Sequence, residues 1–354
     1  MSTVNKAPAA PAGSPQPQPG GPGRIRSALA VTSPGLRVRF QTSLQQLMAF
    51  GSLIVLVILF GILNPRFLQP TNLSDILLST VVIGLLALGA TFVIVTGGID
   101  LSVGTGMSLC SVMTGVVLTN LGMPLIFGVL GGILAGALMG AVNGFFVSYL
   151  KIPPFIATLA MMMVAQGLAL VISGTKPIYF NDTPGFSALA LGKPIAGLVI
   201  PNAVFIFFAA AVVAGILLSR TLIGRYTFSI GSNEEATALS GINVRKWKLL
   251  IYTLAGSFTG LAGVIIAARL NSAQPGQGMG YELQAIAAVV IGGTSLAGGK
   301  GSIIGTVIGA LIMSVMTNGL RVISVPQEWQ NVAIGVVILI AVYLDMLRRK
   351  ENST

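Results

Sequence analysis

The residue in this chain best suited to chemistry is Asp100, within "VTGGIDLSVGTG" at residues 95–106. This stretch separates two apolar runs and adds the hydroxyl groups of Thr96 and Ser102 to four glycines. Asp100 could cap the helix that follows, because a carboxylate there accepts backbone N–H bonds. It could instead face a polar cavity, where it would control an inner gate or touch a substrate. Both interpretations stay open, and one residue can do both.

A second stretch, "VIGGTSLAGGKG" at 290–301, agrees with the first at six of twelve positions, at an offset of 195 residues. The two stretches predict a parallel internal repeat, as transporters with broken helices often have. Of the ten membrane spans predicted below, the repeat would relate spans 1–4 to spans 7–10. The residues that we expect at a gate or in a translocation path are Thr96, Gly97, Gly98, Asp100, Ser102, Gly292, Gly293 and Ser295.

The chain lacks the side chains that most other kinds of catalytic or metal site require. Histidine is absent and Cys110 is the only cysteine, so the chain can form no intrachain disulfide, catalytic Ser–His pair or His/Cys metal site. The stretch "LAGGKGS" at 296–302 has Gly301 after Lys300, where a phosphate-binding loop needs Ser or Thr. We therefore predict no catalytic residues, no metal and no cofactor, and we expect any ATP to be bound by another chain.

The elements that hold these residues are membrane helices. The 354 residues are 54% hydrophobic and 8% charged, with a mean hydropathy of +0.89, whereas soluble domains are about 25% charged. Each crossing of a bilayer needs about 20 apolar residues, and runs of that kind fill most of the chain. A β-barrel would need alternating rather than continuous hydrophobicity. We predict an all-α polytopic membrane protein.

The pattern predicts about ten transmembrane helices. They are expected near 46–63, 76–96, 103–120, 124–147, 154–172, 200–219, 249–268, 284–297, 302–320 and 330–346. The eighth is too short to cross alone as a straight helix, and it ends in glycines. We expect it to be a broken or re-entrant element.

Basic residues explain the net charge of +11 without nucleic acid, because they stand at the ends of apolar runs. With the amino end inside, fifteen lysines and arginines fall in inner segments and five in outer segments. The positive-inside rule then predicts an even number of crossings with both termini in the cytoplasm. We expect a disordered Pro/Gly-rich cytoplasmic tail at 1–42, a transmembrane domain at 43–347 and a short cytoplasmic tail at 348–354.

Two series of glycines recur at four-residue spacing. One is Gly132, Gly136, Gly140 and Gly144, and the other is Gly301, Gly305 and Gly309. Each series forms a smooth strip on a helix, along which another backbone can approach closely. We prefer packing within one chain to a subunit interface, and the alternative stays open.

The polar segment at 220–248 suggests a contact with a partner. Ser232 followed by Glu235 forms a capping box, and Gly241 stands where a helix would end, so we predict a helix over 233–240. Its acidic first turn and small side chains suit a cleft on a protein partner better than a membrane surface.

Three stretches carry a resemblance to a known family. "TGGIDLSVG", "GSNEEATALSGI" and "GYELQAIAAVVIGGTSLAGGKGSIIGT" resemble the membrane permease subunit of ribose-type ABC sugar importers, and the similarity runs from about residue 45 to 346. The family often has Gly at position 232 and a basic residue at 238, where this chain has Ser232 and Ala238.

The resemblance implies several partners. They are a second permease copy, a cytoplasmic ABC ATPase and a periplasmic sugar-binding protein, with the lipid bilayer around the helices. The resemblance also implies that a coupling segment of this chain contacts the ATPase. The residues of this coupling segment are Gly231, Ser232, Asn233, Glu234, Glu235, Ala236, Leu239, Ser240, Gly241 and Ile242. The expected function is the import of a monosaccharide, ribose above others, by alternating access.

Outer loops offer further contacts. Amides, hydroxyls, carboxylates and aromatic faces bind neutral sugars, and residues 268–284 carry several of them. We name Asn271, Gln274, Tyr281 and Glu282, with ordinary solvated loops as the alternative. Other expectations that stay open are another sugar, a polyol or a furanose signal molecule as cargo, an ion-coupled secondary transporter, and an enzyme acting on lipid-linked sugars.

Overall fold

The computed structural model describes Thr3, residues 34–194 and residues 199–353. The chain divides into two units, Met1–Gln41 and Thr42–Thr354. Most of the predicted tail at 1–42 therefore lies outside the described residues. Helix α1 begins at Pro34, which is before the predicted end of this tail.

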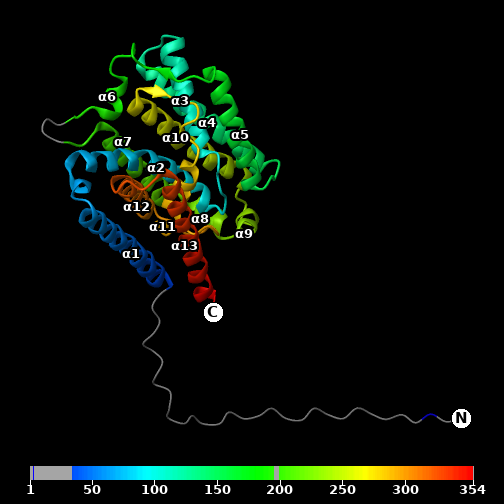
Figure 1. The fold of residues 1–354 in the computed structure, drawn as a ribbon. Helices are drawn as coiled ribbons and strands as arrows, with labels where there is room; N and C mark the ends of the chain where they lie inside the picture. Colours follow the sequence, from blue (N-terminus) through cyan, green and yellow to red (C-terminus); the bar gives the residue numbers. More distant parts are fainter. Residues whose placement is uncertain (1–2, 4–33, 195–198, 354) are drawn as a thin grey trace. The chain divides into compact units, whose positions relative to one another are not determined.

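Helices make up nearly all of the described structure (Figure 1). In chain order they are α1 (Pro34–Leu63), η1 (Pro65–Leu68), α2 (Pro70–Val95), α3 (Val103–Gly115), the π-helical turn η2 (Val116–Asn120), α4 (Leu125–Ser148), α5 (Pro154–Ser173), α6 (Phe186–Leu191), α7 (Asn202–Arg220), α8 (Leu222–Ser232), α9 (Glu234–Leu239), α10 (Val244–Leu270), α11 (Tyr281–Ile291), α12 (Ile303–Val322) and α13 (Gln327–Ser353). Two short strands, β1 (Ile178–Tyr179) and β2 (Ser272–Ala273), pair antiparallel.

The all-α membrane architecture is confirmed. Nine helices in the described part of the chain are long and apolar enough to cross a membrane, and each matches a predicted span. The remaining prediction, 284–297, corresponds to α11, which is apolar but has only 11 residues. At about 1.5 Å per residue α11 is too short to cross a bilayer of about 30 Å, as its sequence indicated.

Helix α2 forms the centre of the second unit. Its residues from Val81 to Val95 are all buried, and it packs against α7, α10, α11 and α12. In α1, α5 and α13, by contrast, few side chains along the apolar span are buried. A helix that is apolar on all sides and enclosed by other helices behaves as a core element.

The most extensive contact between the described helices joins α4 to α10, which run in opposite directions, because Gly260 lies against Gly132 and Leu249 lies against Gly144. A side chain at Gly136 would collide with the backbone of Gly256, and one at Gly140 would collide with the backbone of Tyr252. The first glycine strip therefore packs within the chain. The second strip does the same, because Gly309 of α12 lies against the backbone of Ala288 in α11.

Two opposite sides of this unit can be defined from the helix ends. On one side, which we call the α9 side, α2 and α4 end, α10 begins and α9 lies between α8 and α10. On the other, the β side, α10 ends and β1 pairs with β2. Both glycine-rich stretches contact each other on the α9 side, where the Gly299 N–H donates to the Val95 carbonyl at 2.9 Å.

Candidate functional site

Asp100 lies in the connection between α2 and α3 and is 97% buried. One oxygen of its carboxylate accepts hydrogen bonds from the Ser102 backbone N–H at 2.8 Å and from the Ser102 hydroxyl at 2.6 Å. The Ser102 Oγ in turn accepts a bond from Asn143 Nδ2 of α4 at 2.9 Å. Asp100 thus fixes the backbone just before α3 and, through Ser102, ties it to α4.

The N-cap of α3 is Ser102, not Asp100. The prediction that Asp100 is the N-cap is therefore wrong: Asp100 stands two residues before this cap and accepts a hydrogen bond from its N–H group instead. Asp100 lies outside both spans, and burial raises the pKa of its carboxyl while the bonds from Ser102 oppose the shift. In this conformation the carboxylate faces packed protein.

Other polar groups around this connection come from helices far apart in the sequence. Thr158 of α5 accepts a hydrogen bond from the Leu101 N–H at 3.2 Å and donates to the Ile99 carbonyl at 3.1 Å. The Tyr252 hydroxyl of α10 is buried without a hydrogen-bond partner among the described residues, and so is Oδ1 of Asn143. Sequence reasoning missed Asn143, Thr158 and Tyr252, because nothing in their own helices marks them.

The two glycine stretches end their preceding helices with the same turn. In the first, Gly97 has a φ of +80° and the Gly98 N–H donates to the Val93 carbonyl. In the second, Gly293 has a φ of +89° and the Thr294 N–H donates to the Val289 carbonyl. Both are Schellman turns, in which the residue with positive φ is glycine. The equivalent glycines are therefore Gly97 and Gly293, one residue out of the ungapped sequence register; the wider repeat remains a prediction.

The remaining predicted path residues separate into two groups. Thr96 donates to the Val93 carbonyl through its hydroxyl, and Gly98 lies beside the Tyr252 hydroxyl, so both belong to the first turn. Gly292 packs on Gly305 of α12, and the Ser295 N–H donates to the Lys300 carbonyl within the second connection. The two groups are linked by Gly298 and Gly299 of the second connection, which lie against Val95 at the end of α2.

Helix α9 forms where the sequence predicted one, but its N-cap is different. Asn233 caps it by accepting a hydrogen bond from the Ala236 N–H at 2.9 Å. The predicted capping box is wrong, because α8 continues through Ser232 and keeps that backbone helical. Gly241 follows α9 with a φ of +82°, as expected for a residue that ends a helix.

The exposed side of α9 is shaped for contact. The Leu239 side chain is 84% exposed, whereas Thr237 on the opposite face is buried. Glu234 forms an ion pair with Lys248 of α10 at 2.6 Å. A cleft of about 820 Å³ lies beside α9 and is bordered by Glu235, Ala238 and Ile242 on one side and by Lys151 on the other.

Gly231, the first residue of the predicted coupling segment, lies at a junction. A side chain there would collide with the Val95 carbonyl and the Gly299 N–H. Gly231 stands in the last turn of α8, one residue before its end. The backbones of α2, α8 and the α11–α12 connection therefore meet at this glycine.

The predicted outer contacts lie on the β side, but they do not form one site. Asn271 and Gln274 flank β2, and the Asn271 carbonyl accepts a bond from the Phe180 N–H. Glu282 is buried, and its carboxylate accepts from the Gly280 N–H at 3.0 and 3.1 Å. Tyr281 alone lines a cavity.

This cavity, which we call the α11–α13 cavity, has a volume of about 520 Å³. It lies between the first half of α2, the start of α11, the end of α12 and the start of α13. Ser79, Gln284 and Thr317 contribute polar groups to it, together with residues of the α12–α13 region that sequence reasoning did not find.

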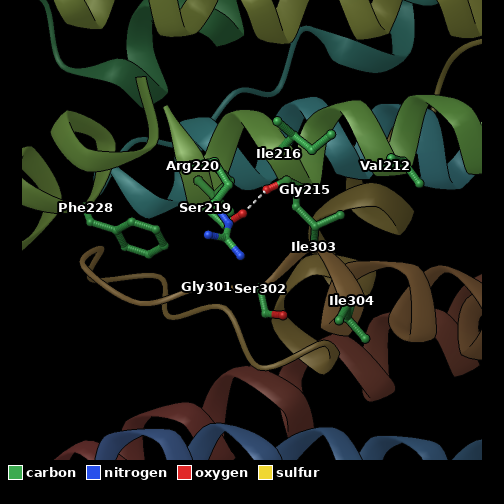
Figure 2. A pocket seen from close by; sticks show the side chains of 11 residues that line it. Val212, Gly215, Ile216, Ser219, Arg220, Phe228, Gly301, Ser302, Ile303 and Ile304 are labelled. Carbon is green, nitrogen blue, oxygen red and sulfur yellow. Dashed lines mark hydrogen bonds between the residues drawn. The ribbon is translucent and has the colours of Figure 1, made fainter. Parts of the chain in front are cut away.

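A second cavity of about 380 Å³ lies between α7, α8 and α12 (Figure 2). Arg220 and Ser302 face it, but Val212, Ile216 and Ile304 make most of its wall apolar. It offers few hydrogen bonds to a hydroxylated ligand.

Comparisons with known proteins agree with these features. Residues 72–342 match the model of a family described as "Branched-chain amino acid transport system / permease component". The chain is 47% identical to the ribose import permease protein of Bacillus subtilis, over 90% of this chain and 97% of that protein. It is 41% identical to the ribose import permease protein of Escherichia coli, over 83% and 91%, and 38% identical to the L-arabinose transport system permease protein of the same species, over 86% and 92%. No solved structure matches the chain.

Proposed function

We propose that this chain, which belongs to the family of branched-chain amino acid transport system permease components, is the translocation subunit of an ATP-driven importer of a monosaccharide, with ribose as the favoured cargo. The main support for the proposal is the sequence identity of 47% with a ribose import permease along nearly the whole of both chains. The family description names amino acids, but the ribose and L-arabinose permeases above are named for sugars.

The α9 side faces the cytoplasm in this proposal. Lys151, Lys248 and Lys300 all lie on that side, and fifteen of the twenty basic residues fall in segments assigned to it. Both termini are then cytoplasmic, and the β side with the α11–α13 cavity faces outward. The protein is a multi-pass protein of the bacterial inner membrane, with lipid around its exposed apolar helices.

A cytoplasmic ABC ATPase docks on α9 and the cleft beside it. The docking region contains the ten predicted coupling residues from Gly231 to Ile242, of which Leu239 is among the most exposed. Since α8 touches the end of α2 and the α11–α12 connection through Gly231, a movement of α9 would reach both. The chain itself carries out no bond chemistry; a second copy and a periplasmic sugar-binding protein complete the importer.

The experiment that tests this proposal is uptake of labelled D-ribose into proteoliposomes that contain the permease, the ATPase and the binding protein. We expect Glu235→Arg to abolish uptake and stimulation of the ATPase, because it reverses the charge at the edge of the docking cleft. Glu235→Gln is the matched control and should keep at least half of both activities, and both variants should insert normally.

Two results would contradict the proposal. Wild-type coupling in Glu235→Arg would remove α9 as the docking helix. Sugar uptake driven by an ion gradient in proteoliposomes without ATP and without the ATPase would instead favour a secondary transporter.

A further inference from the structure

The α11–α13 cavity differs from the other cavities in the number of neutral polar groups that line it. Five neutral side chains that can hydrogen-bond a ligand come from the start of α11 and the start of α13, and the charged Arg321 joins them from the end of α12; the neutral five are Tyr281, Gln284, Gln327, Gln330 and Asn331. Ile83, Leu283 and Ile334 supply an apolar wall. A concave site with an apolar lining and a few convergent polar groups is the usual form of a small-molecule site.

The polar groups suit a ligand that carries hydroxyls. Each carboxamide offers two donors and an acceptor, so it can pair with a hydroxyl in either direction. The Tyr281 ring can lie against the C–H face of a sugar, and its hydroxyl can bond to the sugar's edge. The volume of about 520 Å³ accommodates a pentose with several water molecules.

Several of these groups are available for a ligand. Within the described residues, the side chains of Tyr281 and Gln284 make no hydrogen bond. Gln330 is buried and its amide nitrogen donates to the Val325 carbonyl at 2.8 Å, which leaves its oxygen to accept. Gln327 donates to Asn331 only at 3.4 Å, so this pair can rearrange around a ligand.

The charged groups in the lining of the cavity favour a neutral sugar over an amino acid as the ligand. Arg321 lines it, but no carboxylate does among the described residues. The carboxylate of the neighbouring Glu282 is buried and occupied by the Gly280 N–H. The ammonium group of an amino acid would therefore enter without a counter-ion, which is costly away from bulk water. A neutral sugar has no such cost.

The position of the cavity suits the first contact with a cargo. On the β side, Met279 and Gly280 line it just before the short helix α11. Next to them, Gly278 is packed so closely on Gly104 at the start of α3 that neither tolerates a side chain. The start of α3 therefore lies directly beside the residues that lead into the cavity.

We infer that the α11–α13 cavity is a low-affinity subsite for a neutral pentose, in which Gln284, Tyr281 and the amides of α13 bind the sugar hydroxyls. The inference rests on the proposed function and adds to it a cargo site on the permease itself. It also provides a physical reason why this chain would carry sugars although its family is described by amino acids.

The test measures equilibrium binding of D-ribose to the purified full-length chain in detergent, followed by uptake in the reconstituted importer. We expect saturable millimolar binding that L-leucine does not compete for. Gln284→Leu should weaken binding about tenfold and raise the KM for uptake at saturating binding protein, because the amide is lost and an apolar group remains. Gln277→Leu is the matched control, since Gln277 is also partly buried but lies in the turn before α11, outside the cavity lining.

The outcomes separate this inference from the proposed function. If the wild-type importer takes up no sugar, the proposed function fails. If uptake occurs but the purified chain binds no D-ribose, or Gln284→Leu behaves like Gln277→Leu, the subsite is overturned. It is also overturned if Gln284→Leu keeps D-ribose affinity and instead loses docking of the binding protein, since the surface would then serve protein recognition.

Discussion

The two connections that follow the glycine turns start alike and are held in different ways. After the turn at Gly97, residues 96–102 are fixed by side chains: Asp100 bonds to Ser102, and Thr158 of α5 bonds to the backbone on both sides of Asp100. After the turn at Gly293, residues 292–302 are longer and partly exposed. Among the described residues, their backbone hydrogen bond to α2 is the one from the Gly299 N–H to the Val95 carbonyl, and Gly298 and Gly301 also lie against Val95.

The difference indicates which connection can move. A buried network that joins three helices resists displacement, because any shift leaves polar groups unpaired in the core. The second connection makes its described contacts to α2 and α8 mainly through glycine backbones, at Gly298, Gly299 and Gly231. We therefore expect the first to anchor the core and the second to follow α8 and α9 when a partner binds.

The largest effect should come from the residue at which the two connections meet. Gly231→Val would place a side chain against backbone atoms of Val95 and Gly299, which cannot move aside as a flexible side chain could. We expect a loss of about 3 kcal/mol or more in stability and no sugar uptake. Thermal unfolding of the detergent-purified protein measures the first, and proteoliposome uptake the second.

Gly167→Val is the control, because Gly167 lies in helix α5 with nothing within 4 Å of an added Cβ. It should cost less than about 1 kcal/mol. If Gly231→Val were as stable and as active as this control, the contact between the two connections would have no mechanical role.

The second largest effect should come from substitutions in the hydrogen-bond network around Asp100. Asp100→Ala leaves the hydroxyl and the N–H of Ser102 without their acceptor, and we expect a loss of about 2 kcal/mol in stability. Asp100→Asn keeps an acceptor oxygen, so it should cost about half as much. Uptake normalised to folded protein distinguishes the two roles of Asp100: an unchanged value in Asp100→Asn would rule out the gate and leave only the anchor.

The sequence predicted the membrane helices well because continuous hydrophobicity over about 20 residues is rare outside membrane-spanning segments. It also indicated that residues 284–297 cannot cross alone, and α11 agrees. It missed α8, an 11-residue helix at Leu222–Ser232, because that helix is short and lies in a polar segment. The wrong cap of α9 followed from this omission, since Ser232 is available as a cap only if α8 ends earlier.

The site was harder to predict because its residues converge from distant helices. Asn143 and Thr158 meet the Asp100 connection from α4 and α5, and their own surroundings in the sequence are ordinary apolar helix. Similarly, Tyr281 was recognised as a candidate contact, but Arg321 and Asn331 join it only through the packing of α11, α12 and α13. Spacing along one helix contains no information about such meetings.

A smaller effect than that of Asp100→Ala should come from the second connection. Gly299 has a φ of +73°, and a Cβ there would lie 2.9 Å from Ser232 Oγ, which can rotate away. Gly299→Ala should therefore cost about 1–2 kcal/mol, mostly from the left-handed backbone. Gly276→Ala is the control, since Gly276 has open space around it and no positive φ. Because Gly299 touches the end of α8, Gly299→Ala should lower uptake per ATP hydrolysed more than it lowers stability. A proportional loss of both, as expected for Asp100→Ala, would mean that the second connection is an anchor like the first.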